Sequence, residues 1–231
     1  MAILTYVPLK SRLLRDFDRL KRYYRQVLSS DFSEINAEVL FAKSRIAYEA
    51  LIPQIPFIGK NNPLLVFLIP SAQHLALYRA MTGMGRSLEE TGQLIYRLSE
   101  AQFKAYPLWM GRLIQRAWFS NWFRSRLRRR AEESHARLYA GNYVFNFIDG
   151  QGESFDYGID YLECASCKFL KQQQAFELAP YVCAVDQVAS ETLGWGLQRS
   201  TTLAEGAACC DFRFKRGGDT RITLPPVLNK K

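Results

Sequence analysis

Apolar residues in the first half of the chain recur every three to four positions, the spacing that places them on one face of a helix. Over residues 9–30 they are interleaved with arginine and lysine, and this pattern predicts one long, basic amphipathic helix. A second helix is expected to follow the cap-like Asp31 and Ser33 and to end near Leu51. The prolines of residues 53–63 cannot continue a helix, so this segment is predicted to be a connector.

Three further helices are predicted in the middle of the chain. Residues 72–81, which follow a proline, have helical spacing and end in a glycine-containing stop. Ser87 and Glu90 have the spacing of a capping box, in which each side chain bonds the backbone amide of the other residue, so a helix is expected over residues 88–105. Tryptophans and leucines at helical intervals, with arginines between them, predict another helix over residues 107–139.

After residue 142 the pattern changes to alternation of large apolar and smaller or polar residues. Residues 143–147 and 155–161 alternate in this way on either side of the glycine-containing turn 149–152, which predicts a β-hairpin. Two helices and two strands are then expected, over residues 165–174, 176–188, 197–204 and 210–214.

Helices followed by a mainly antiparallel sheet with inserted helices predict an α+β fold, in which an N-terminal helical layer packs on a small sheet. The 231 residues, of which 48% are hydrophobic, are compatible with a single domain, 1–231. Within it we expect a mainly helical part, a sheet-containing part that carries the site, and a tail, over residues 1–140, 141–216 and 217–231.

The amino terminus and the cysteines indicate where the protein resides. Residues 1–8 contain no long apolar stretch, so a secretory signal is not expected. The most apolar window, residues 63–81, is interrupted by proline, histidine and arginine and is too polar to span a membrane. Five cysteines, an odd number, favour free thiols in a reducing compartment. We expect a cytoplasmic protein, with peripheral membrane attachment as the alternative.

The last third of the chain combines thiol, carboxylate, guanidinium and hydroxyl groups. A thiolate is a strong nucleophile whose pKa falls beside a cation, so Cys183 and Cys210 are candidate nucleophiles. Asp186 lies three residues after Cys183 and would share its helix face. Arg199 has the geometry to hold a substrate carboxylate through two parallel hydrogen bonds, and Thr202 could add a neutral one.

Each of these residues also has a structural interpretation. A free cysteine is most often a small buried apolar residue, and this interpretation is favoured for Cys209. An aspartate at the end of a strand most often caps or pairs, so Asp211 and Arg199 could instead form a structural salt bridge.

The segment TTLAEGAACCDFRF, residues 201–214, is preceded by Arg199 and by Cys183 with Asp186. These elements resemble the carboxy-terminal signature of the L-2-amino-thiazoline-4-carboxylic acid hydrolase family. In that family an arginine, a Thr-Leu-Ala-x-Gly turn and a Cys-Asp-Phe triplet follow a Cys-x-x-Asp element. The resemblance covers the last third of the chain, and the helical front matches only in general character.

The resemblance implies a hydrolase acting on a C–N bond of a small cyclic amidine-like substrate, such as 2-amino-thiazoline-4-carboxylate, which opens to N-carbamoyl-cysteine. Either a thiolate or an activated water would attack the ring, while a carboxylate moves protons. Carried over to this chain, the catalytic positions are Cys183, Asp186, Cys210 and Asp211, and the substrate-binding positions are Arg199 and Thr202. An earlier cysteine of the family corresponds to Cys164 or Cys167. No cofactor is expected.

A metal site is a competing prediction. Cys164 and Cys167 have the spacing of a metal-binding pair, and Cys183 with Cys209 or Cys210 could complete four thiolates around zinc or an iron-sulfur cluster. The pair is also compatible with two ordinary buried thiols.

The Arg112–Arg137 helix supports an alternative from another functional class. Residues 112–137 contain eight arginines and two glutamates, with aromatic residues interleaved. Such a helix could bind an anionic membrane surface or an acidic protein, and nucleic acid is the less favoured partner. The protein would then be a noncatalytic ligand-binding or accessory protein. A solvated helix whose tryptophans pack in the core is the structural interpretation of the same pattern.

Overall fold

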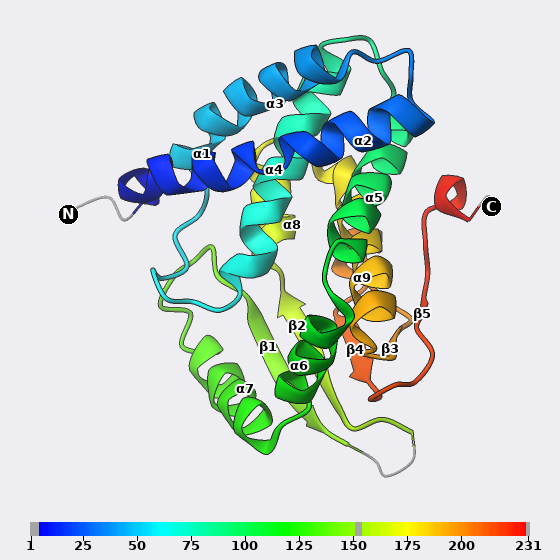
Figure 1. The fold of residues 1–231 in the computed structure, drawn as a ribbon. Coiled ribbons are helices and arrows are strands. Elements are labelled where there is room, and N and C mark those ends of the chain that lie inside the picture. The colour runs from blue at the N-terminus through cyan, green and yellow to red at the C-terminus, as the bar shows by residue number, and fades with distance from the viewer. Residues whose placement is uncertain (1–4, 151–153, 230–231) are drawn as a thin grey trace.

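The computed structural model describes residues 5–150 and 154–229 and has the predicted α+β architecture (Figure 1). Within these residues five strands form a sheet in the order β1-β2-β4-β3-β5. Neighbouring strands are antiparallel except for β3 and β5, which are parallel. The strands are β1 (Val144–Asp149), β2 (Tyr157–Glu163), β3 (Leu197–Arg199), β4 (Cys210–Phe214) and β5 (Arg221–Ile222).

Five helices form the N-terminal layer: α1 (Lys10–Asp18), α2 (Lys21–Asp31), α3 (Ala37–Leu51), α4 (Leu65–Thr82) and α5 (Leu88–Lys104). α3 packs along α4, and α2 packs on α5 (Figure 1). Fully buried aromatic rings fill the space between them, and the rings of Phe17 and Tyr48 stack with centroids 5.0 Å apart. The amphipathic spacing along each helix therefore produces one apolar core against which the rest of the chain packs.

The single helix predicted over residues 9–30 is wrong, because the chain bends between α1 and α2. The Leu20 amide bonds the carbonyl of Phe17 at 2.8 Å, a tight turn that ends α1. This bend lets Phe17 and Tyr24 both contact the ring of Phe41, so the apolar spacing continues across the break and conceals it.

Two other predictions about helix starts also need correction. Asn36, rather than Asp31 or Ser33, caps α3, because its side chain accepts the amides of the second and third residues beyond it. Pro70 lies inside α4 rather than before it. The helix tolerates a proline there, near its start, at the loss of one backbone hydrogen bond.

The capping box that begins α5 is confirmed. The Glu90 amide donates to Ser87 Oγ at 3.1 Å, and the Ser87 amide donates to Glu90 Oε2 at 2.8 Å. Both bonds satisfy amides that a helix start leaves without partners.

The helix predicted over residues 107–139 is two helices, α6 (Leu108–Trp118) and α7 (Asn121–Ser134). Ser120 separates them, because its Oγ accepts the Phe123 amide and caps α7. At the break the Trp118 ring stacks between other aromatic rings, 4.4 Å from Trp195 and 4.6 Å from Phe123. The turn thus brings together aromatic rings from α6, α7 and the segment after α9.

The β-hairpin is confirmed, with Phe147 opposite Ile159 in the antiparallel register, while residues 151 and 152 of its predicted turn lie outside the described residues. The predicted strand 197–204 ends at Arg199, because a 3-10 helix, Leu203–Glu205, follows it. The predicted tail contributes β5. Further 3-10 helices lie at Val7–Leu9, Ile52–Gln54, Phe176–Leu178 and Pro226–Leu228.

Two helices, α8 (Ala165–Gln172) and α9 (Ala179–Leu193), lie between the sheet and the N-terminal layer (Figure 1). α8 contacts α4, whereas α9 contacts α5 on one side and β3 and β5 on the other. Gly194, in the left-handed conformation, ends α9 and turns the chain into β3. α8 and α9 therefore direct residues of their inner faces toward the ends of β2 and β4.

Candidate functional site

Three thiols meet where β2 ends and α8 begins. Cys164 is the N-cap residue of α8, and Cys167 lies in its first turn. The thiol of Cys167 interacts with the thiols of both Cys164 and Cys183, the latter on α9. The first turn of α8 and the inner face of α9 thus bring together cysteines that are far apart in sequence.

The surroundings of Cys164 lower the pKa of its thiol. The largest cause is a hydrogen bond from the thiol of Cys167, and the backbone amides of Cys167 and Ser166 add to it against the opposing effect of burial. The pKa of Cys167 is raised, because its hydrogen bonds to Cys164 and Cys183 and its burial all favour the protonated form. Of Cys164 and Cys167, Cys164 is therefore the thiol that ionises first, and a thiolate at a helix N-terminus is a reactive nucleophile.

Cys210, at the start of β4, also borders this cluster, but its environment favours the neutral thiol. Burial raises its pKa to about 12, against the effect of the Leu203 amide, which donates to its sulfur at 3.2 Å. Cys210 is therefore a weak candidate for the attacking group at neutral pH.

Asp186 and Arg199 form an ion pair of 2.5 Å beside the thiols. The Arg199 side chain is only 2% exposed, whereas the Asp186 side chain is 26% exposed. Burial raises the pKa of Asp186, and the Arg199 charge offsets this only in part. Asp186 is thus a carboxylate that solvent can reach and that can carry a proton.

The guanidinium of Arg199 is largely occupied by the protein. Besides Asp186, it donates to the Cys183 carbonyl at 3.3 Å, and it lies over the Phe212 ring, 5.2 Å from the centroid. Its buried Nε has no hydrogen-bond partner among the described residues. Arg199 therefore orients Asp186.

Tyr161 lies within electrostatic reach of these groups, although its place in the strand pattern suggested only a core aromatic residue. Burial raises the pKa of its hydroxyl, and the charges of Cys164, Asp186 and Cys210 raise it further. These effects require Tyr161 to lie close to all three groups. The feature of the sequence that could have identified Tyr161 as a site residue is its position at the end of the hairpin, three residues before Cys164.

Thr202 and Asp211 hold the loop that follows β3. The Thr202 hydroxyl donates to Glu205 Oε2 at 2.7 Å and accepts the Glu205 amide at 3.1 Å. Asp211 accepts the amides of Ser200 and Thr201 at 2.9 and 2.7 Å, and these bonds and those of the two hydroxyls lower its pKa despite the opposing effect of burial. Since side chains alternate along a strand, Asp211 points away from the face that carries Cys210.

The predicted four-thiolate metal site has no matching geometry within the described ranges. No group of three or more histidine, cysteine or acidic side chains there is arranged to hold a metal ion. Cys209 precedes the first residue of β4 and lies outside the strand that carries Cys210. The histidines lie elsewhere, with His74 on α4 and His135 at the end of α7, where it bonds Asn146 at 2.9 Å.

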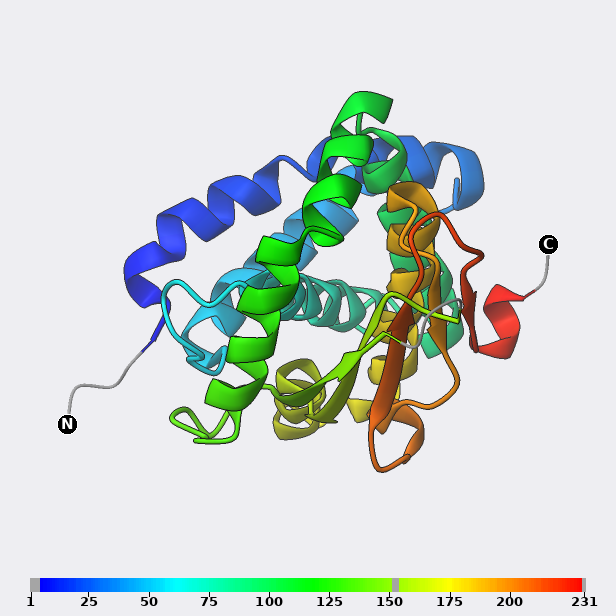
Figure 2. The same ribbon diagram turned by 90° about the horizontal axis from the view of Figure 1, so that it is seen from below.

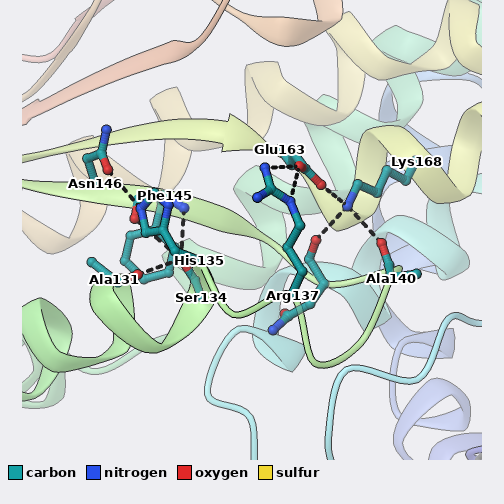
Figure 3. A network of polar contacts seen from close by, with 10 residues as sticks. Ala131, Ser134, His135, Arg137, Ala140, Phe145, Asn146, Glu163 and Lys168 are labelled. Carbon is teal, nitrogen blue, oxygen red and sulfur yellow. Dashed lines mark hydrogen bonds and ion pairs between the residues drawn. The ribbon is translucent and has the colours of Figure 1, made fainter.

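A polar network holds the junction that presents Cys164 (Figure 3). Glu163, the last residue of β2, accepts Arg137 Nε at 2.9 Å and also pairs with Lys168 of α8. Hydrogen bonds from Lys168 and then from Arg137 lower the pKa of Glu163. Lys168 also donates to the carbonyls of Ala140 and Asn142 at 2.8 and 2.9 Å. The end of β2 and the start of α8 are thereby fixed on both sides of Cys164.

A model of the L-2-amino-thiazoline-4-carboxylic acid hydrolase family matches residues 71–214, a range well over half of the chain. The match begins within α4 and ends with β4. It therefore covers the two strands, β2 and β4, and the two helices, α8 and α9, that meet at the thiol cluster. Neither a curated protein nor a solved structure matches the chain.

Proposed function

Because the chain belongs to the L-2-amino-thiazoline-4-carboxylic acid hydrolase family, we propose that it opens the ring of 2-amino-thiazoline-4-carboxylate, or of a close analogue, by hydrolysis. The observation that carries this proposal is that the Tyr161 hydroxyl lies within electrostatic reach of both the Cys164 thiol, whose pKa is lowered, and the partly exposed Asp186 carboxylate. A nucleophile and a group able to transfer protons side by side are what such a reaction requires.

The substrate defines what the site must do. Its ring carbon C2 is bonded to sulfur and to two nitrogens, one of them through the C=N bond. Formation of N-carbamoyl-cysteine adds water at C2 and breaks the C2–S bond, so that C2 becomes a urea carbonyl and the sulfur leaves as a thiol. The C–N bonds at C2 are retained in this product.

We assign the attack to Cys164. Its thiolate adds to C2 of the protonated amidine, and the tetrahedral adduct collapses with release of the ring sulfur as a thiolate. The product of this step is an isothiouronium on Cys164. Asp186 then accepts a proton from water as the water attacks the same carbon. The second adduct expels the Cys164 thiolate and gives its hydroxyl proton to solvent, which forms the urea carbonyl. Asp186 passes the proton taken from water to the released sulfur, so that atoms and charge balance and both groups return to their starting states.

The other residues of the site position these groups. Arg199 holds Asp186 through the 2.5 Å ion pair. The Tyr161 hydroxyl can donate to the ring nitrogen once the thiolate has added to C2 and that nitrogen has regained a lone pair, because the raised pKa of the hydroxyl keeps it protonated. Cys210 and Phe212 supply the wall of the site from β4.

The experiment that tests the proposal uses the thiol of the product. The substrate has no free thiol, so turnover by purified protein can be followed with a chromogenic disulfide after removal of excess thiols. We expect wild type to release thiol and Cys164→Ser to lose activity on the order of 1,000-fold or more. Cys209→Ser, which changes a thiol outside the cluster, serves as the matched control and should keep wild-type turnover.

Two outcomes would contradict parts of the proposal. A folded wild-type protein without turnover would contradict the ring-opening activity itself. Full activity in Cys164→Ser would remove Cys164 as the nucleophile and leave direct attack by water. Intact-mass analysis of acid-quenched turnover should show an adduct on wild type that Cys164→Ser does not form.

A further inference from the structure

α6 lies on the surface with much of its apolar side uncovered. None of its residues is buried. Leu108 is 84% exposed, Trp109 63% and Leu113 55%, and Trp109 and Leu113, four residues apart, share one face of the helix. Side chains of this kind on an ordinary helix pack on the core, so this face has no partner within the described part of the chain.

α7 continues this surface. Figure 2 shows α6 and α7 end to end across the face of the molecule that is seen from below. Trp122, in the first turn of α7, is 69% exposed, and the guanidinium of Arg126 lies over its ring at 5.5 Å. The exposed apolar surface thus extends across the Ser120 break from one helix to the next.

The charge of this surface has one sign. Residues 101–131 contain no aspartate or glutamate. Five of the arginines in these residues make no ion pair with any described carboxylate: Arg112, Arg116, Arg124, Arg126 and Arg129. Arg128 and Arg130, in contrast, pair with Asp149 and Glu133. The arginines that accompany the exposed tryptophans are therefore those left without a counter-charge.

We propose that this α6–α7 surface, made by Leu108, Trp109, Arg112, Leu113, Arg116 and Trp122, binds the surface of a bilayer that contains anionic lipids. Indole and leucine side chains enter the boundary between headgroups and acyl chains, and the arginines bind lipid phosphates beside them. The helices would lie in the plane of the interface. No helix in the described ranges is long and apolar enough to cross a membrane.

The shape and composition of the surface favour a bilayer over other partners. Nucleic acid would use the arginines and the tryptophans but would leave Leu108 and Leu113 exposed. A folded acidic protein needs a matching relief, whereas a bilayer accepts a protruding helix. The surface also has firm support, because Gln115 Nε2 donates to the Gly194 carbonyl at 2.8 Å and Trp118 stacks on Trp195.

Co-sedimentation of the full chain with vesicles tests the proposal. We expect binding to vesicles of phosphatidylcholine mixed with phosphatidylglycerol, little binding to phosphatidylcholine alone, and release as salt is raised. Trp109→Ala with Leu113→Ala should reduce binding at least about tenfold, as should Arg112→Gln with Arg116→Gln. Matched controls on the N-terminal layer, Ile46→Ala for an exposed apolar residue and Arg15→Gln for an exposed arginine, should bind as wild type does.

Other results would overturn the proposal. Equal binding of the four variants and wild type would place the contact elsewhere. Absence of vesicle binding together with concentration-dependent dimers in sedimentation, lost in Trp109→Ala with Leu113→Ala, would assign the surface to a second copy of the chain. Binding to single-stranded RNA but not to vesicles would assign it to nucleic acid. The turnover assay is independent of each of these outcomes.

Discussion

The N-terminal layer and the α8–α9 site region handle charge in opposite ways. In the N-terminal layer the ion pairs lie at the surface, as where Lys21 and Arg25 reach Glu38 at 2.8 and 2.6 Å, with side chains 40% or more exposed. In the site region the Arg199 side chain is 2% exposed. Among the residues that the structure describes, Arg199 is the one charged residue that is buried. Surface pairs contribute little to stability, whereas a buried pair is costly to break.

This difference indicates what each region contributes. The interior of the N-terminal layer is made mostly of apolar groups and supplies burial, the main favourable contribution to folding. The site region keeps a charge, several thiols and a tyrosine hydroxyl where apolar residues would pack as well. Buried polar groups of this kind are retained where chemistry needs them, which supports the proposed location of the active site.

The largest expected effect is the loss of the buried ion pair. Asp186→Asn leaves the Arg199 guanidinium buried without a counter-charge, and we expect the free energy of unfolding to fall by roughly 3–5 kcal/mol. Denaturant unfolding followed by circular dichroism measures the change.

A double variant separates charge from packing. Asp186→Leu with Arg199→Met replaces the pair by apolar side chains, and it should recover most of the lost stability while remaining without turnover. An Asp186→Asn protein within about 1 kcal/mol of wild type would show that the guanidinium has found other partners, and the contrast between the two regions would then be wrong.

His74 tests the comparison from the other side, because it is a titratable group of the N-terminal layer. Burial lowers its pKa to about 4 from 6.5, and its Nδ1 has no partner among the described residues. The unfolded chain therefore takes up a proton near pH 6.5 that the folded protein takes up only near pH 4. The contribution of His74 to the free energy of unfolding is therefore fully present above pH 6.5. It is lost as the pH falls toward 4, and the total loss is roughly 3 kcal/mol.

The measurement is the difference between wild type and His74→Gln in unfolding free energy at pH 7.5 and pH 4.5. The two proteins should differ in pH dependence over this interval, since the variant lacks the titrating group. Parallel curves would mean that His74 is protonated in the folded protein, and the N-terminal layer would then also bury a charge.

The capping box and the hairpin were predicted correctly because both depend on neighbours in sequence. Ser87 and Glu90 are three residues apart, and the alternation around Ile159 needs only the period of a strand. The break after α1 and the break at Ser120 were missed, since apolar spacing continues through both. Tertiary packing, of Phe17 in one case and of Trp118 in the other, decides where the chain turns.

The candidate site was predictable to a similar degree. The spacing of Cys183 and Asp186 on a helix, with Arg199 on the following strand, was readable in the sequence, and the structure brings these residues together. The lowered pKa of Cys164 was not readable, because it arises from a neighbouring thiol and from helix amides whose direction only the fold defines. Tyr161 was hidden among core aromatics for the same reason.

A smaller effect is expected at the junction before Cys164. Glu163→Gln removes the charge that pairs with Arg137 and Lys168, and we expect about 1 kcal/mol of lost stability, because the Glu163 side chain is partly exposed. Since this network fixes the start of α8, the variant should also slow alkylation of Cys164 by iodoacetamide at neutral pH. Peptide mass spectrometry measures that rate, and an unchanged rate would show that α8 alone positions the thiol.

The smallest effect is expected in the N-terminal layer, at Glu38. Its carboxylate is held by hydrogen bonds from Arg25 and Lys21, which lower its pKa to about 2. The group is fully exposed, so solvent screens both interactions and both long side chains lose freedom when they pair. Glu38→Gln should therefore leave the unfolding midpoint within error of wild type, at low and at high salt. A different result would contradict this expectation: Glu38→Gln would be clearly less stable than wild type, and added salt would lower the stability of wild type by a similar amount. Surface charge would then stabilise the N-terminal layer, and the two regions would differ in degree only.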